Sequence, residues 1–276
     1  MEQMLKTMLE NVRAKSPLVH NITNYVTVND VANVLLAAGG SPIMSDDADD
    51  VEDITSICGG LNINIGTLNK NTIPSMFLAG KKANALGHIV LLDPVGAGAS
   101  RLRTDTANRL MREVRFDAVR GNISEIKTLC TGSGSTKGVD ADAVDAVTEA
   151  NLDDGVALVK AFAKQTGCII AVTGAIDLVS DGARCWCIRN GRAEMSRITG
   201  TGCQLSALMT AFLVANPDHK LDAAAAAVCM MGLAGEIGWA NMQPGDGNST
   251  YRNRIIDAIF NMTGDALEEG AKYELR

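Results

Sequence analysis

Short apolar runs of strand length alternate with longer helical patterns along most of this chain, and this alternation constrains the fold more than any other feature. Strands are predicted at 41–44, 61–65, 89–92, 118–119 and 168–172, with a hairpin at 176–188. Helices are predicted at 26–38, 74–86 (with Thr72 as a possible cap), 104–114, 152–165, 203–214, 222–242 and 250–262. Such alternation is typical of βαβ units wound around a parallel sheet.

The fold class follows from this pattern. We predict an α/β protein, built as a three-layer α/β/α sandwich around a mostly parallel central sheet. The 276 residues are enough for one large domain with a substantial core. The chain shows no internal repeat and no low-complexity linker, although 132–138 (GSGSTKG) has the composition of a loop. We therefore expect a single domain over residues 1–276.

Composition and charge exclude several classes of function. The formal net charge is −7 and no cluster of Lys and Arg is present, so nucleic acid is not expected as a partner. The apolar stretch at 223–231 is too short to cross a bilayer, so no membrane association is expected. The seven cysteines show no paired C-x-x-C spacing, and residues 1–15 lack the apolar core of a signal peptide. Free thiols in a reducing compartment, the cytoplasm, are therefore expected.

Polar residues and glycines follow the predicted strands at the points where the strands end. They lie at 44–46, 66–67, 93–98, 120–122 and 173–174. Ligands of open parallel sheets bind beyond the carboxyl ends of the strands. Taken singly, these segments are ordinary strand-to-helix turns. Together they predict a binding site along one edge of the sheet.

The segment 199–207 (TGTGCQLSA) is the sharpest single signal. Its two glycines allow the backbone N–H groups of Gly200, Thr201, Gly202 and Cys203 to turn toward one point, and an apolar helix follows at once. Free N–H groups at a helix N-terminus favour phosphate oxygens, so this segment is predicted to form an anion hole. It matches neither the P-loop pattern nor the dinucleotide-binding pattern. A purely structural loop-to-helix turn is the alternative.

Cys203 falls in the first turn of that helix. A thiol there can have its pKa lowered by the helix end and a nearby cation, which would make it a possible proton acceptor. The alternative is that Cys203 is a small buried hydrophobic residue, as most free cysteines are.

The segment 120–125 (RGNISE) carries a second possible phosphate and metal signal. Asn122 and Glu125 lie three residues apart, so they share one face of a helix that begins there. An amide and a carboxylate side by side suit Mg²⁺, which keeps several of its waters. The same pair also fits a helix N-cap with Glu at its third position. Arg120, directly before them, is a permanent cation that could clamp a phosphate.

Taken in order, five runs resemble the ribokinase-like superfamily and, within it, the hydroxyethylthiazole kinases. They are 19–26 (VHNITNYV), 41–45 (SPIMS), 93–98 (DPVGAG), 120–125 (RGNISE) and 199–203 (TGTGC). The Asn-x-x-Glu and Gly-x-Gly elements belong to the wider superfamily. The first two runs point to the thiazole kinases in particular, and the resemblance covers essentially the whole chain.

The resemblance implies a role for individual residues of this sequence. Met44, Gly200 and Asn24 would contact the thiazole, and Arg120 and Thr173 would contact ATP. Glu125 would orient Mg²⁺ through water, with Asp93 as a further candidate for the same metal.

Cys203 would be the catalytic residue that faces the attacking hydroxyl. Most members of the superfamily carry Asp at this position, and the thiazole kinases resemble this chain in having Cys.

The implied reaction transfers a phosphoryl group from ATP, with Mg²⁺, to the hydroxyl of 4-methyl-5-(2-hydroxyethyl)thiazole in thiamine salvage. The resemblance also implies a homotrimer whose sites lie at subunit boundaries. Three other functions remain open from the sequence: a hydroxymethylpyrimidine kinase, a pyridoxal kinase of the same fold, and a non-catalytic nucleotide-binding sensor.

Overall fold

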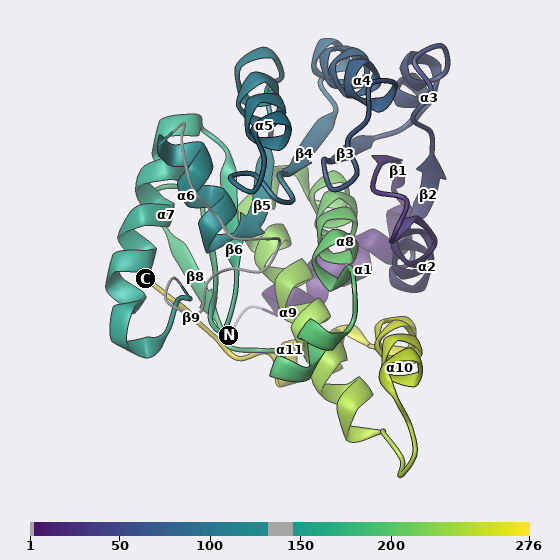
Figure 1. Ribbon diagram of the computed structural model, residues 1–276. Helices are drawn as coiled ribbons and strands as arrows, with labels where there is room; N and C mark the ends of the chain where they lie inside the picture. The colour runs from purple at the N-terminus through teal and green to yellow at the C-terminus, as the bar shows by residue number, and fades with distance from the viewer. Residues whose placement is uncertain (1–2, 132–145) are drawn as a thin grey trace.

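A nine-stranded sheet forms the centre of the structure (Figure 1), a computed structural model that describes residues 3–131 and 146–276. In spatial order the strands are β2 (Ser41–Met44), β1 (Leu18–Ile22), β3 (Gly60–Asn64), β4 (Ile89–Asp93), β5 (Ala118–Asn122), β6 (Ile169–Thr173), β7 (Asp177–Ser180), β8 (Cys185–Ile188) and β9 (Tyr273–Leu275). Neighbours from β2 to β6 pair in parallel. Strands β7, β8 and β9 continue the sheet in antiparallel pairs. The predicted, mostly parallel sheet is confirmed.

Helices cover both faces of this sheet, which confirms the three-layer sandwich. One layer holds α3 (Val51–Ile57), α4 (Thr72–Leu86), α5 (Arg101–Glu113), α6 (Ile123–Thr131) and α7 (Leu152–Thr166). The other holds α1 (Met4–Lys15), α2 (Val28–Ala38), α8 (Thr201–Ala215), α9 (Lys220–Ala240), α10 (Asn248–Asn261) and α11 (Gly264–Gly270). Short 3₁₀ turns occur at η1 (Glu149–Asn151), η2 (Ala193–Arg197) and η3 (Pro217–His219).

Local sequence explains the elements that were predicted. Every residue of β4 is buried, as its apolar run requires. Helix α2 ends at Gly39, whose φ of +97° lies in the left-handed region that glycine adopts without steric cost. Helix α5 begins where the Ser100 hydroxyl accepts a hydrogen bond from the Arg103 backbone N–H.

Strand β1 was not predicted, because polar residues interrupt it. His20 is fully buried, and its ring nitrogens lie 3.0 Å from the Thr55 hydroxyl and 2.9 Å from the Ser45 carbonyl. These partners come from distant segments, so the sequence of the strand alone does not reveal that its polar groups are satisfied. Helices α1, α3 and α11 and strand β9 were also missed, and the loop predicted at 132–138 lies outside the described residues.

The segment Pro217–Ala240 is long and apolar enough to cross a membrane by length and composition. In the fold, however, 78% of its most apolar window is buried. Its helix α9 packs against α8, α10 and the strands β6, β7 and β8. The segment is therefore the central helix of its layer.

Candidate functional site

The carboxyl ends of the parallel strands meet beside the first turn of α8. Helix α8 packs on β1, β3 and β4, and its N-terminus therefore lies at this edge of the sheet. Contacts between side chains or backbone groups, described below, bring the predicted site residues together there: Asn24, Met44, Asp93, Arg120, Glu125, Thr173, Gly200, Gly202 and Cys203.

The start of α8 has the geometry expected of an anion hole. Gly200 caps the helix with a φ of +85°, and a Cβ at this position would lie only 2.1 Å from Cγ2 of Thr27. Only glycine fits this turn. The first N–H groups of α8, from Thr201 onward, have no carbonyl partner within the helix, and the helix dipole adds partial positive charge to them.

Arg120 lies directly against this turn. A Cβ on Gly202 would fall 2.4 Å from Nη1 of Arg120, so the guanidinium occupies the space beside the glycine. Its Nη2 donates a hydrogen bond to the Thr173 hydroxyl, and its Nη1 lies 3.6 Å from Oδ2 of Asp93. The two residues expected to bind ATP are therefore in contact, with a fixed positive charge next to the anion hole.

Asp93 is fully buried at the end of β4. Its Oδ2 accepts hydrogen bonds of 2.8 Å from Asn64 and 2.8 Å from the Ser206 hydroxyl, while its Oδ1 has no partner within the described residues. Burial raises the pKa of Asp93, although Arg120 and these hydrogen bonds act in the opposite direction.

Glu125 and Asn122 form a reciprocal helix cap. The Asn122 side chain accepts from the Glu125 backbone N–H at 2.8 Å, and the Asn122 backbone N–H donates to Oε2 of Glu125 at 2.8 Å. The Gly96 backbone N–H donates to Oε1 at 2.7 Å. Burial and the negative charge of Asp93 raise the pKa of Glu125 to about 7. The predicted cap at the start of α6 is thus confirmed. The Glu125 carboxylate also lies close enough to Asp93 for the charge of Asp93 to raise its pKa.

These groups fit a magnesium ion of the kind that keeps most of its waters. The buried Oδ1 of Asp93 has no partner within the described part of the chain, and Glu125 contributes a second carboxylate beside it. No group of three or more His, Cys, Asp or Glu that could hold a metal occurs in residues 3–131 and 146–276. Mg²⁺ needs no such cage, because it is bound by one or two carboxylates together with substrate phosphates.

Cys203 is buried in a small apolar cluster with Val19, Val31 and Leu35, and Met44 packs against the same cluster. Its Sγ accepts a hydrogen bond of 3.1 Å from Nδ2 of Asn24. Burial and the charge of Asp93 raise the pKa of the Cys203 thiol. Burial and the nearby carboxylate outweigh Arg120 and the hydrogen bonds to the sulfur, so of the two interpretations open from the sequence the structure favours the small buried residue over a thiol with a lowered pKa.

Several residues that hold the site residues in place through hydrogen bonds were not predicted from the sequence. Asn64 and Ser206 both donate to Asp93, and Thr27 donates to Oδ1 of Asn24 at 3.0 Å. Ser206 lies three residues after Cys203 on α8, and this spacing alone places the two side chains near one face. No comparable spacing in the sequence marks Asn64 or Thr27 as a site residue.

Arg103 is another residue that the sequence did not single out. Its Nη2 donates to the Gly66 carbonyl at 2.7 Å, and its guanidinium packs on Gly96, where a Cβ would lie 2.2 Å from Nη1. Arg103 therefore ties the turn after β3 to the turn after β4, whose Gly96 N–H binds Glu125.

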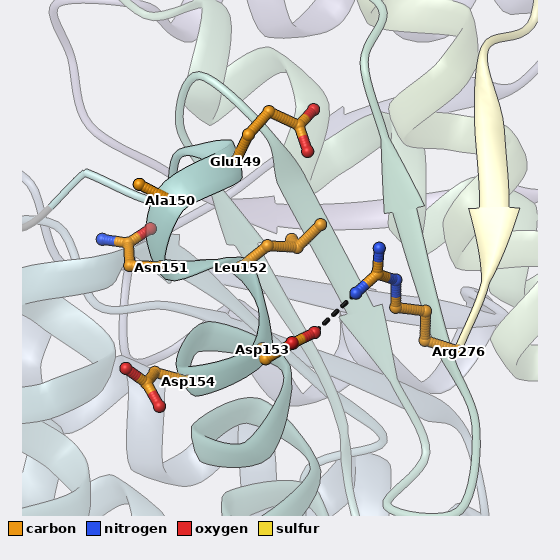
Figure 2. Close-up of a pocket in the computed structure, with 7 residues that line it drawn as sticks. All are labelled: Glu149, Ala150, Asn151, Leu152, Asp153, Asp154 and Arg276. Carbon is orange, nitrogen blue, oxygen red and sulfur yellow. Dashed lines mark hydrogen bonds and ion pairs between the residues drawn. The ribbon is translucent and has the colours of Figure 1, made fainter.

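A separate hollow of about 220 Å³ lies at the start of α7, beside the C-terminal residue (Figure 2). An ion pair between Asp153 and Arg276 crosses it. Its lining residues are Glu149, Ala150, Asn151, Leu152, Asp153, Asp154 and Arg276. It contains none of the predicted site residues and is not the candidate site.

Known proteins match both the sequence and the fold. Hydroxyethylthiazole kinase of Clostridium acetobutylicum is 58% identical over 271 residues, which cover 98% of this chain and 99% of that protein. The structure of hydroxyethylthiazole kinase from Pyrococcus horikoshii OT3 is 32% identical, with a TM-score of 0.88 over 99% of each chain.

A more distant structure shares the fold alone. Pyridoxal kinase from Staphylococcus aureus, in complex with AMP-PCP and pyridoxal, is 13% identical with a TM-score of 0.59, covering 94% of this chain and 98% of that one. The Hydroxyethylthiazole kinase family matches residues 9–265 of the present sequence. On this evidence the chain belongs to the hydroxyethylthiazole kinase family.

Proposed function

We propose that this protein transfers the γ-phosphoryl group of ATP to the hydroxyl of 4-methyl-5-(2-hydroxyethyl)thiazole, giving the monophosphate for thiamine salvage. The observation that carries the proposal is the anion hole at Gly200–Cys203, with Arg120 packed against it and Asp93 beside Arg120. Family membership supports the choice of the thiazole alcohol as substrate.

Positioning and charge stabilisation supply most of the acceleration in phosphoryl transfer. The N–H groups at the start of α8 and the Arg120 guanidinium hold the oxygens of the transferring group. Thr173 fixes the guanidinium through its hydroxyl. Glu125 and Asp93 would hold Mg²⁺, which would supply positive charge to neutralise the phosphate oxygens when bound.

Met44, Asn24 and Gly200 line the side of the site where the thiazole alcohol enters. The hydroxyl oxygen forms a bond to the γ-phosphorus as the bond to the bridging oxygen of ADP breaks. In the small fraction of molecules in which Cys203 is a thiolate, the hydroxyl proton passes to its sulfur. In the others it passes to the phosphoryl oxygens. A thiol with a raised pKa contributes little as a base at neutral pH, so Cys203 acts mainly by facing the hydroxyl.

A panel of alcohols tests the proposed function directly. ADP release is measured with the thiazole alcohol, with hydroxymethylpyrimidine, with pyridoxal and with no acceptor. We expect the highest kcat/KM for the thiazole alcohol. A preference for either of the other alcohols would assign a different kinase of the same fold, and nucleotide binding without turnover would indicate a sensor.

Replacing Cys203 separates its chemical role from its packing. We expect Cys203→Asp to keep or raise kcat, because a carboxyl group has a much lower ordinary pKa than a thiol and Asn24 can still donate to it. Cys203→Ala should lower kcat by about 10²-fold or less, at the low end of general-base effects. kcat and Tm are measured for both variants. An unfolded or inactive Asp variant beside an Ala variant equal to the parent would mean that Cys203 only packs.

Glu125 makes the stability of the metal-free protein depend on pH. Its pKa is about 7 in the fold against an ordinary 4.5, so burying the ionised carboxylate costs free energy above pH 7. The cost disappears as the pH falls through 7 toward 4.5. Glu125→Gln loses one acceptor, because its amide nitrogen must face the backbone N–H of Gly96 or of Asn122, and this loss is the same at every pH. In EDTA we therefore expect the stability of Glu125→Gln relative to the parent to rise by about 2 kcal/mol between pH 5.5 and pH 8.

Urea unfolding at the two pH values measures this difference, since other titrating groups are shared by parent and variant. The same variant should need about tenfold more Mg²⁺ for half-maximal turnover, the usual scale of effects on outer metal contacts. A Mg²⁺ titration identical to that of the parent would limit Glu125 to capping α6.

We propose that the protein is a cytoplasmic homotrimer with each thiazole site at a subunit boundary. Tyr25 and Val26 follow Asn24 directly and are 76% and 58% exposed, which places a large apolar surface at the rim of the site. Leu36, on the adjoining helix α2, is exposed as well. Sedimentation at assay concentrations should give a trimer. A fully active monomer would contradict the proposal.

A further inference from the structure

The geometry points to Asn64, the last residue of β3, as a positioning residue that holds Asn24 and Asp93 in the arrangement needed for reaction. This inference rests on the proposed function. Asn64 is only 1% exposed, and its side-chain amide makes three hydrogen bonds. Its Oδ1 accepts from the Gly66 backbone N–H at 2.9 Å and from Nδ2 of Asn24 at 3.1 Å. Its Nδ2 donates to Oδ2 of Asp93 at 2.8 Å.

One backbone group fixes the orientation of this amide. A backbone N–H can only donate, so the Asn64 atom that faces the Gly66 nitrogen must be the carbonyl oxygen. The amide nitrogen then faces Asp93, where a donor suits a carboxylate. A flipped amide would set N–H against N–H at Gly66 and oxygen against oxygen at Asp93. Asn64 therefore has a single favourable orientation.

This orientation is passed on to Asn24. Because Oδ1 of Asn64 is an acceptor, the Asn24 atom facing it must be Nδ2, one of whose hydrogens is used there. The same Nδ2 lies 3.1 Å from Sγ of Cys203, so its other hydrogen points to the sulfur. Oδ1 of Asn24 accepts from the Thr27 hydroxyl at 3.0 Å. The sulfur of Cys203 thus receives a donor rather than a carbonyl.

The result is a continuous chain of hydrogen bonds, Asp93–Asn64–Asn24–Cys203, buried at the edge of the sheet. At one end is Asp93, which would help to hold the metal beside the phosphates, and at the other is Cys203, assigned above to the hydroxyl. Asn64 is the link between these two ends. A displacement of about 1 Å at reacting groups can cost about 10²-fold in rate, so loss of this link should act on turnover.

The same strand offers a matched control. Asn62 is fully buried on the same face of β3, two residues from Asn64, and donates to Oδ1 of Asn21 at 3.1 Å. Its partner, Asn21, lies on β1 and is not among the residues assigned to the reaction. Truncating Asn62 therefore removes a buried amide without breaking the hydrogen-bonded chain from Asp93 to Cys203.

The test compares Asn64→Ala with Asn62→Ala. Tm is measured for both variants, and kcat and KM for ATP and the thiazole alcohol are measured at a temperature well below both Tm values. We expect both variants to lose Tm, Asn64→Ala more than Asn62→Ala, because Asn64 makes three side-chain hydrogen bonds and Asn62 donates one. Only Asn64→Ala should lower kcat, by about 10- to 100-fold, with KM for ATP within about twofold of the parent. If Asn64→Ala does not fold, Asn64→Thr, which is close to Asn in size but cannot span both partners, takes its place.

A double-mutant cycle with Asn24→Ala then shows whether Asn64 acts through Asn24. We expect the loss of kcat caused by the Asn64 substitution to become several-fold smaller once Asn24 has been removed. Equal kcat in the Asn62 and Asn64 variants, or fully additive losses in the cycle, would overturn the inference. A parent protein inactive on the thiazole alcohol would instead refute the proposed function, and the cycle would be measured with the alcohol that the parent does phosphorylate.

Discussion

Arg120→Met is expected to lower kcat by about 10³-fold, at the low end of losses when an arginine that stabilises phosphoryl transfer is removed. The guanidinium touches the anion hole at Gly202, donates to Thr173 and pairs with Asp93. The same change should lower the free energy of unfolding by about 3 kcal/mol, because Asp93 is left as a buried charge without its cation. kcat at saturating ATP and urea unfolding measure the two effects.

Two further variants separate catalysis from stability. Adding Asp93→Asn to Arg120→Met removes the unpaired charge, so stability should recover while kcat stays low. Arg120→Lys should restore little activity, because an ammonium cannot reach Thr173 and Asp93 with the fork of a guanidinium. A kcat for Arg120→Met within about threefold of the parent would remove Arg120 from the proposed mechanism.

Gly202→Ala should lower kcat/KM by about 10²-fold while leaving the fold intact, on the scale of losing one preorganised oxyanion donor. The added methyl group would lie 2.4 Å from Nη1 of Arg120, and the guanidinium is the movable partner. It must leave its place beside the anion hole. Gly202 has ordinary helical backbone angles, and alanine is favoured inside helices, so any loss of Tm should come from the displaced pair of Arg120 and Asp93 and should not exceed that of Arg120→Met.

Gly247→Ala is the matched control, because a Cβ there meets no atom within 4 Å and the residue lies before α10, away from the site. It should leave kcat/KM near the parent value and lower Tm slightly, because Gly247 is the N-cap residue of α10 and alanine is a poorer N-cap than glycine. If Gly202→Ala also kept full activity, the space beside Arg120 would not be needed for binding the phosphates. If it unfolded, the glycine would be required by the fold rather than by the site.

Much of the fold could be predicted from local patterns. Strand β4 was predicted from four apolar residues and ends at Asp93 as expected. The turn 199–203 was recognised because glycine spacing and the apolar run after it are both local features. The cap between Asn122 and Glu125 was predicted for the same reason, since its partners lie three residues apart.

Predictions failed where distant residues decide the outcome. The polar residues His20 and Asn21 made β1 look unlike a buried strand, yet their partners at Thr55 and Asn62 satisfy them in the interior. For Cys203 the sequence left two interpretations open, a thiol whose pKa is lowered by its helix and a small buried residue. Burial and Asp93, which lies on another element, raise the pKa.

The alternating α/β layers, the glycine turn at the start of α8 and the resemblance to the family can be recognised in the sequence, because they depend on periodicity and on short spacings. The pairing of Arg120 with Asp93 and the hydrogen-bonded chain from Asp93 through Asn64 and Asn24 to Cys203 become visible in the folded structure. Those contacts join β4, β3, the turn after β1 and α8, and their protonation states and hydrogen-bond directions depend on burial and on neighbours far away in the chain.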